Sequence, residues 1–106
     1  MDARVLRCGD LQLDTRARVA VRAGREISLT PREVDVLEYL MTHHGQTVTR
    51  DMLERDVWRQ TNRLTSLDNV IDVQIMRLRR KVDAEGEPSL IHTERGLGYR
   101  IGERRP

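Results

Sequence analysis

The sequence predicts an α+β fold in which strands come first, three helices follow, and a hairpin closes the chain. Three observations carry this prediction. Short apolar runs alternate up to Leu29, three later segments have apolar residues at helical spacing, and two strand-like runs surround a glycine-containing loop after Leu90. A length of 106 residues suits one domain. We therefore expect a single domain over 1–106, with an ordered core from about residue 5 to about residue 101.

The segment up to Leu29 predicts an antiparallel meander of three or four strands. Ala23-Gly24 separates the last two runs, and a glycine with positive φ there makes a tight turn that fixes the register of the hairpin. Apolar residues stand two apart, as in strands with one buried face. The predicted inward pairs are Leu11 and Leu13, Val19 and Val21, and Ile27 and Leu29.

The first helix has a complete start signal. Thr30 is the expected N-cap, Pro31 occupies the first helical position, and Glu33 completes a capping box. Gly45 is the expected left-handed residue that ends the helix. The predicted buried stripe consists of Val34, Leu37, Leu40 and Met41.

A short second helix follows a segment with room for a single strand pairing, residues 46–48. Thr49 is its expected N-cap, and the helix runs to about Trp58 with Leu53 and Val57 inward. Residues 59–65 are polar and without period, so they predict a loop.

Residues 66–83 predict the third helix, opened by Thr65 and Asp68 in capping-box spacing. From Gln74 to Lys81 the segment has four cations and no acid. The apolar stripe belongs to a core and consists of Ile71, Ile75, Leu78 and Val82. The opposite face is centred on Asn69, Val73, Met76 and Arg80, and is flanked by Val70, Gln74, Arg77 and Lys81.

Residues 90–101 predict a hairpin whose loop carries Arg95 at the tip. Three helices, the last one basic, followed by such a hairpin is the element order of a winged helix-turn-helix with an added N-terminal meander. In that fold the third helix fits the major groove of DNA, and the hairpin, called the wing, reaches the backbone or the minor groove.

Positive charge is concentrated in the second half of the chain. Residues 1–58 hold nine arginines and ten acids, a net of −1, whereas residues 59–106 hold ten basic residues and seven acids, a net of +3. Only Lys81 among the nineteen basic residues is a lysine, and the planar guanidinium fork suits phosphate and guanine. A GC-rich genome is the simpler explanation for the arginines of the first half.

Other classes of protein are disfavoured. A single cysteine, Cys8, excludes an intramolecular disulfide and argues for a reducing compartment. No apolar run approaches a membrane span, so we expect a cytoplasmic protein without membrane contact. Cys8, the His43-His44 pair and His92 lie in separate elements, without catalytic or metal-ligand spacing. We therefore expect no enzyme activity, metal or cofactor.

Four motifs resemble the effector domain of OmpR/PhoB-type two-component response regulators. They are LTPRE at 29–33, Val57-Trp58, NVIDV at 69–73 followed by RLRRK at 77–81, and TERGLGY at 93–99. The resemblance covers the chain from about Val5 to Ile101. It implies a transcription factor with a phosphorylatable receiver domain, a cognate sensor kinase, and direct repeats of double-stranded DNA bound head to tail. These 106 residues contain no receiver domain, so we expect an excised domain or a stand-alone regulator.

By position, the resemblance implies base or groove contacts at Asn69, Val70, Val73, Gln74 and Arg77, nearly the same face as the helical wheel. Arg77 is the best candidate for a bidentate guanine contact, Gln74 suits adenine, and a valine suits a thymine methyl. Gln74 and Met76 stand where the family often has basic residues or histidine, and Val34 where it often has Phe. The first two departures leave the target sequence open.

The resemblance places Arg95 in the minor groove and phosphate contacts at Trp58, Arg79, Thr93 and Tyr99, and the wheel favours Arg80 and Lys81 for phosphate. Two of these residues have a second interpretation. Trp58 is equally typical of a half-buried core residue. Arg79 lies beside the core edge on the wheel, so an ion pair with an acid competes evenly with a phosphate contact.

The rival function is a protein-interaction module in which the 59–65 loop and the basic helix contact a partner protein. In the family this loop is linked to RNA polymerase, which makes it a candidate second activity. DNA binding weakens steeply with salt through counterion release, whereas a largely apolar protein interface does not. The candidate contact residues are Arg59, Gln60, Thr61, Asn62 and Arg63.

Overall fold

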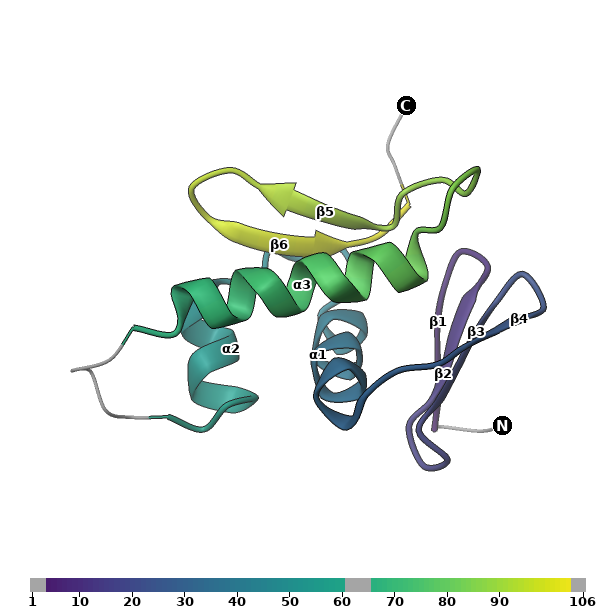
Figure 1. The fold of residues 1–106 in the computed structure, drawn as a ribbon, viewed down its shortest axis with the longest axis horizontal. Helices are drawn as coiled ribbons and strands as arrows, with labels where there is room; N and C mark the ends of the chain where they lie inside the picture. The colour runs from purple at the N-terminus through teal and green to yellow at the C-terminus, as the bar shows by residue number, and fades with distance from the viewer. Residues whose placement is uncertain (1–3, 61–65, 104–106) are drawn as a thin grey trace.

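The computed structural model describes residues 4–60 and 66–103, in which a four-stranded sheet precedes three helices and a two-stranded hairpin. In Figure 1, α3 runs alongside the hairpin, and α1 and α2 lie on the opposite side of α3. The four-stranded sheet lies beyond the C-terminal end of α3. The predicted fold class is confirmed. The elements are β1 (Val5–Cys8), β2 (Leu11–Asp14), β3 (Val19–Arg22), β4 (Arg25–Ile27), α1 (Pro31–Thr42), α2 (Arg50–Asp56), α3 (Asp68–Val82), β5 (Ile91–Glu94) and β6 (Gly98–Ile101).

The N-terminal sheet has the order β1-β2-β3-β4 with antiparallel neighbours, and the predicted turn is present. Ala23 and Gly24 both have positive φ, 50° and 80°, as a two-residue hairpin turn requires. The predicted inward face of β3 is wrong, because Val19 is exposed whereas Ala20 and Arg22 are buried.

The register of the sheet explains this reversal. Leu13 pairs with Ala20, and Leu11 pairs with Arg22. Residues directly opposite one another in an antiparallel pair point to the same face. Once the two leucines of β2 face the core, the register brings Ala20 and Arg22 inward with them.

The first two helix starts are confirmed. The Thr30 hydroxyl accepts from the Glu33 amide at 3.2 Å, and the Glu33 carboxylate accepts from the Thr30 amide at 2.9 Å. Thr49 caps α2 by accepting from the Met52 amide at 3.1 Å. The α2 helix ends at Asp56, two residues before the predicted end at Trp58.

The end of α1 is also earlier than predicted. The helix ends at Thr42 with His43 as its C-cap, and Gly45 lies beyond it. Gly45 does adopt the left-handed conformation, with φ 80°, but its amide donates to the Ile101 carbonyl at 3.0 Å instead of closing the helix. This glycine thus connects the α1–α2 loop to the hairpin.

The predicted capping box of α3 is wrong. The helix begins at Asp68, and its N-cap, Leu67, makes no side-chain capping bond. The Ser66 hydroxyl accepts from the Asp68 amide at 3.2 Å. Thr65 lies outside the described residues. Leu67 is buried with the core, so apolar packing holds the N-cap residue in place beside the Ser66 hydrogen bond. The predicted buried stripe of Ile71, Ile75, Leu78 and Val82 is confirmed.

The hairpin docks onto the α1–α2 connection through one bridge. Val48 and Tyr99 exchange backbone hydrogen bonds of 2.7 and 2.8 Å, which is the single pairing predicted for residues 46–48. Gly98 beside this bridge has φ 152°, and a Cβ there would lie 2.1 Å from the Val48 carbonyl oxygen. Only glycine allows the hairpin to approach so closely.

Candidate nucleic-acid interface

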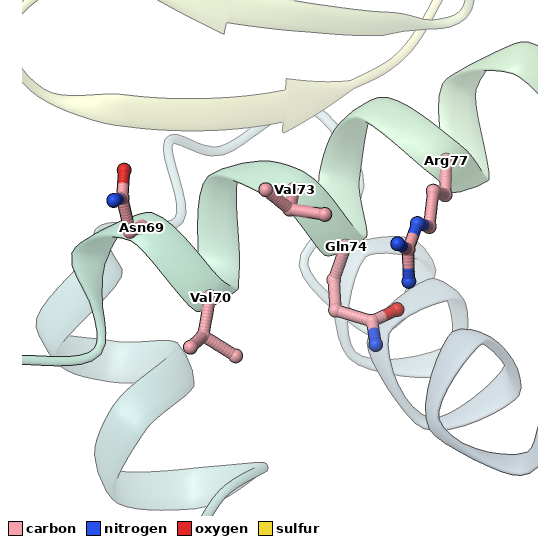
Figure 2. A pocket seen from close by; sticks show the side chains of 5 residues that line it. All are labelled: Asn69, Val70, Val73, Gln74 and Arg77. Atoms are coloured by element: carbon pink, nitrogen blue, oxygen red, sulfur yellow. The ribbon is translucent and has the colours of Figure 1, made fainter.

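The outward face of α3 brings together the five residues predicted to contact bases. They line one shallow hollow of about 340 Å³ (Figure 2). In that view Val70, Gln74 and Arg77 extend from successive turns toward the same side of the helix. The residues that line the hollow are Asn69, Val70, Val73, Gln74 and Arg77.

This face mixes apolar and polar side chains. Val70, Val73 and Met76 of α3 are exposed, and Leu97 near the wing tip is 63% exposed. Large exposed apolar groups beside an arginine and two amides are chemically suited to thymine methyls and base edges. The side-chain oxygen of Gln74 is buried without a hydrogen-bond partner among the described residues.

Three described arginines of α3 and the wing remain available for an anion. Arg77, Arg80 and Arg95 are exposed. Within residues 4–60 and 66–103 none of the three makes a hydrogen bond or an ion pair. Figure 1 places the loop between β5 and β6, which carries Arg95, at the same end of the molecule as the N-terminus of α3. Positive charge is therefore presented by both the helix and the wing.

Asp72 holds α3 against α2 and the wing. Arg50 of α2 donates to both of its carboxylate oxygens, at 2.8 and 3.3 Å, and the Tyr99 hydroxyl of β6 donates to one of them. The hydrogen bonds from Arg50 hold the pKa of Asp72 below its usual range. Tyr99 itself is buried, and burial raises the pKa of its hydroxyl. Its hydroxyl donates to Asp72, and the phosphate contact predicted for Tyr99 stays a prediction.

Arg79 makes a third kind of contact in the described structure, and its predicted phosphate contact stays a prediction. Its guanidinium donates to the Thr93 hydroxyl of β5 at 2.8 Å, and no acid of the described residues pairs with it, so the predicted ion pair is wrong. The Arg79 Nε is buried without a partner in that same part of the chain. Arg79 and Thr93, both predicted phosphate contacts, are thus adjacent and joined by one hydrogen bond.

Lys81 is bound to α1. Its ammonium donates to the Glu33 carboxylate at 2.7 Å, and the Glu33 side chain is only 3% exposed. Burial alone would raise the pKa of Glu33, but the hydrogen bonds from Lys81 and Thr30 lower it overall. Lys81 is therefore paired in this structure, and its predicted phosphate contact stays a prediction.

Trp58 is half-buried against the core, as its second interpretation predicted. The Arg32 guanidinium lies 4.8 Å from the centre of its ring, and Arg32 also donates to the Val57 carbonyl at 2.9 Å. A phosphate contact by Trp58 stays a prediction.

The predicted polymerase-contact loop is only partly described. Arg59 is exposed with φ 54°, and the Gln60 backbone amide donates to the Glu54 carbonyl. Thr61, Asn62 and Arg63 lie outside the described residues.

Sequence reasoning missed the arginines that hold the interface in place. Arg22 and Arg25 bind the end of α3, and Arg50 binds Asp72. The strand register could have indicated Arg22, because Leu11 and Leu13 facing inward bring it inward. Arg50 carries no such signal, since its partner lies 22 residues away.

Three further features concern metal binding, the Cys8 thiol and membrane-spanning helices. Among the described residues no three metal-binding side chains come together. Cys8 is buried, and burial together with nearby acids such as Glu103 raises the pKa of its thiol to about 11, which keeps it protonated near neutral pH. No helix in the described part of the chain is both long enough and apolar enough to cross a membrane.

Comparison with known proteins places this arrangement among related domains. Residues 24–101 match the family described as "Transcriptional regulatory protein, C terminal". The transcriptional regulatory protein PcoR of Escherichia coli is 40% identical over 92% of this chain. The match covers 42% of PcoR, so the chain spans less than half the length of this relative.

Two solved structures are similar over nearly the whole chain. The DNA-binding domain of RstA from Klebsiella pneumoniae, in complex with the RstA box, has a TM-score of 0.81 and is 31% identical to this chain. The match covers 93% of this chain and 97% of the solved RstA domain. The DNA-binding domain of CpxR from Escherichia coli has a TM-score of 0.79 and is 33% identical. That match covers 95% of this chain and 98% of the solved CpxR domain. Sheet, helices and hairpin are therefore shared with both.

Proposed function

This chain belongs to the OmpR/PhoB-class family of transcriptional regulatory protein C-terminal domains, and from that premise we propose that it binds specific sequences of double-stranded DNA and so controls transcription. The family consists of DNA-binding domains of transcription regulators, which is a binding role and not an enzymatic one. One observation supports the proposal most directly. The outward face of α3 gathers base-reading side chain types into one hollow, and no described residue covers it.

In this proposal α3 enters the major groove with the hollow facing the base edges. Arg77 pairs with a guanine, and Val70 or Val73 contacts a thymine methyl. Gln74 reads an adenine after its side chain turns to bring the buried amide oxygen outward. Asn69, at the start of the helix, grips the groove wall. A free guanidinium fork is the group that recognises guanine best, so Arg77 carries the largest share of specificity.

The wing and the far end of the helix supply the non-specific grip. Arg95 enters the minor groove, where a narrow A·T-rich segment attracts guanidinium. Arg80 contacts a phosphate. The Arg79–Thr93 pair lies where a second phosphate can accept from both groups, since each keeps a donor to offer.

Further features follow from the family and are proposed with it. Residues from about 5 to 101 act as one domain that operates in the cytoplasm beside a receiver domain, under a cognate sensor kinase. Two copies bind direct repeats head to tail. The 59–65 loop contacts RNA polymerase, and an exposed Arg59 at its start is compatible with that role.

Selection from random oligonucleotides, followed by binding measurements at several salt concentrations, tests the proposal. We expect an enriched half-site repeated at a fixed spacing, and an affinity that falls steeply with salt because several phosphates are contacted. A selection without any enriched sequence would contradict the proposal. Binding to a partner protein with little salt dependence would instead favour the rival interaction module.

A further inference from the structure

Two arginines flank the Ala23-Gly24 turn of the β3–β4 hairpin, and both reach the end of α3. Arg22, whose side chain is 1% exposed, donates to the Val82 carbonyl at 2.9 Å and to the Asp83 carboxylate at 2.7 Å. The same guanidinium donates to the Pro88 carbonyl. One buried side chain of the N-terminal sheet therefore binds both ends of the α3–β5 connection.

Arg25 binds the same connection from the solvent side. It donates to the Glu87 carboxylate at 2.7 Å and to the Lys81 carbonyl at 3.2 Å. The Glu87 carboxylate also accepts from the Ala84 amide at 3.0 Å. The last carbonyls of a helix lack partners within the helix, and cations there are favoured by its dipole, so the two arginines complete the end of α3.

Asp83 carries this arrangement to the wing. Its side chain is 4% exposed and accepts from the amides of Leu90, at 3.0 Å, and Ile91, at 3.1 Å. Ile91 is the first residue of β5. The root of the wing is thus fixed to the end of the helix by one carboxylate, which Arg22 holds in turn.

We propose that Arg22 and Arg25, the hairpin arginines, position the wing relative to α3, so that the N-terminal sheet helps to determine which flanking DNA the domain prefers. This inference rests on the proposed function, in which α3 and Arg95 contact DNA at separate places. The hairpin arginines are positioning residues, because neither lies on the proposed DNA-binding face.

The length of the wing makes its direction sensitive to its root. A strand rises about 3.3 Å per residue, so the four steps from Ile91 to Arg95 put the tip about 13 Å from the root. A rotation of about 10° at the root then moves Arg95 by about 2 Å, which is enough to break a hydrogen bond in the minor groove. Losing a contact made by the hairpin arginines is therefore expected to displace Arg95 at the wing tip.

The test compares affinities for one core site with A·T-rich and with G·C-rich flanks, using the 106-residue chain. Arg25→Met and Glu87→Gln remove one partly exposed pair, and Arg22→Lys keeps the buried charge but removes the guanidinium fork. Arg18→Met is the matched control, because Arg18 lies in the turn just before β3 but binds Asp35 and the Pro31 carbonyl of α1. Each variant is also measured with Arg95→Ala.

We expect Arg25→Met to reduce the preference for A·T-rich flanks by about threefold to tenfold, with Glu87→Gln similar and Arg22→Lys at least as large. Affinity on G·C-rich flanks should change by less than about twofold. In the Arg95→Ala background the same substitutions should have little further effect, because the positioned group is gone. Arg18→Met should leave the preference intact.

Folded Arg25→Met and Glu87→Gln variants with wild-type flank preference would overturn the inference, even if Arg22→Lys fails to fold. Effects that simply add to that of Arg95→Ala would also overturn it, since positioning requires non-additivity. A wild-type domain that binds its core site but ignores the flanks has no wing preference to position, which is a third negative result. A wild-type domain without any preferred sequence contradicts the proposed function itself, and is recognised separately.

Discussion

The two halves of α3 differ in what their side chains contact, although both are rich in polar residues. In the first half, from Asn69 to Arg77, the outward side chains line an uncovered hollow. In the second half, Arg79 binds Thr93 and Lys81 binds Glu33. The more basic half of the helix is therefore the less available half.

This difference shows that charge density along a sequence does not measure how much charge a surface offers. The C-terminal half anchors the helix to α1, the sheet and the wing, and among its described cations only Arg80 is without a partner. The N-terminal half is free of such contacts on its outer face. One helix can thus be held rigidly at one end and present side chains at the other.

The largest effect is expected when a contact that anchors the C-terminal half of α3 is removed. Arg22→Met should lower the free energy of unfolding by about 3 to 5 kcal/mol, because Asp83 would keep a buried negative charge without its partner. Urea denaturation followed by circular dichroism measures this loss. Adding Asp83→Asn should recover part of it, and Arg18→Met, which removes an exposed pair, should cost about 1 kcal/mol or less. A loss below about 1 kcal/mol for Arg22→Met would mean that the buried pair does not anchor the helix.

The second largest effect is expected on DNA binding by the N-terminal half of α3. Arg77→Ala should weaken binding to the selected site by about 1 to 3 kcal/mol and relax one base preference, because a bidentate contact is lost. Fluorescence anisotropy and a repeated selection measure both. Stability should stay within about 0.5 kcal/mol of the wild type, since Arg77 makes no hydrogen bond or ion pair with the described residues. An unchanged selection profile would remove Arg77 from the reading face.

Lys81→Met separates anchoring from phosphate binding at one residue. It should lower stability by about 1 to 2 kcal/mol, because the buried Glu33 keeps only the hydrogen bond from Thr30. The slope of affinity against salt should not change, since Lys81 already has a protein partner. A slope reduced by about one phosphate would show that Lys81 leaves Glu33 to bind DNA.

The same variant should change the response to acid. The pKa of Glu33 is lowered in the folded protein from its ordinary value near 4.5, so its contribution to stability is present above pH 4.5 and is lost as the pH falls through the folded-state pKa. Without Lys81 this lowering shrinks. Urea midpoints measured below pH 4.5 should then fall less steeply in Lys81→Met than in the wild type, and equal slopes would argue against the pair.

The smallest effect is expected at Arg80. Arg80→Ala should weaken binding to specific and unrelated DNA alike and reduce the salt slope by about one, because it removes one phosphate contact. Stability should remain unchanged. Titrations at three salt concentrations, with Lys81→Met in parallel, provide the measurement. Equal slopes in Arg80→Ala and the wild type would show that Arg80 contacts no phosphate.

Most features that depend on neighbours in the chain were predictable from the sequence, although the start of α3 and the inward face of β3 were not. The Thr30 and Thr49 caps, the Ala23-Gly24 turn and the buried stripe of α3 all depend on residues within one or two turns, and all are present. The outward face of α3 followed from the same periodicity, which is why the five predicted residues share one hollow. Local spacing suffices because backbone geometry alone places these groups.

Features that depend on distant partners were decided by the tertiary structure. The pairs Arg50 with Asp72, Lys81 with Glu33, and Arg22 with Asp83 join residues 22, 48 and 61 positions apart. A pair of this kind forms only when packing brings its two elements together, and burial then fixes which charges stay inside. The sequence determined which side chains α3 turns outward, and the fold decided which of its charges remain free.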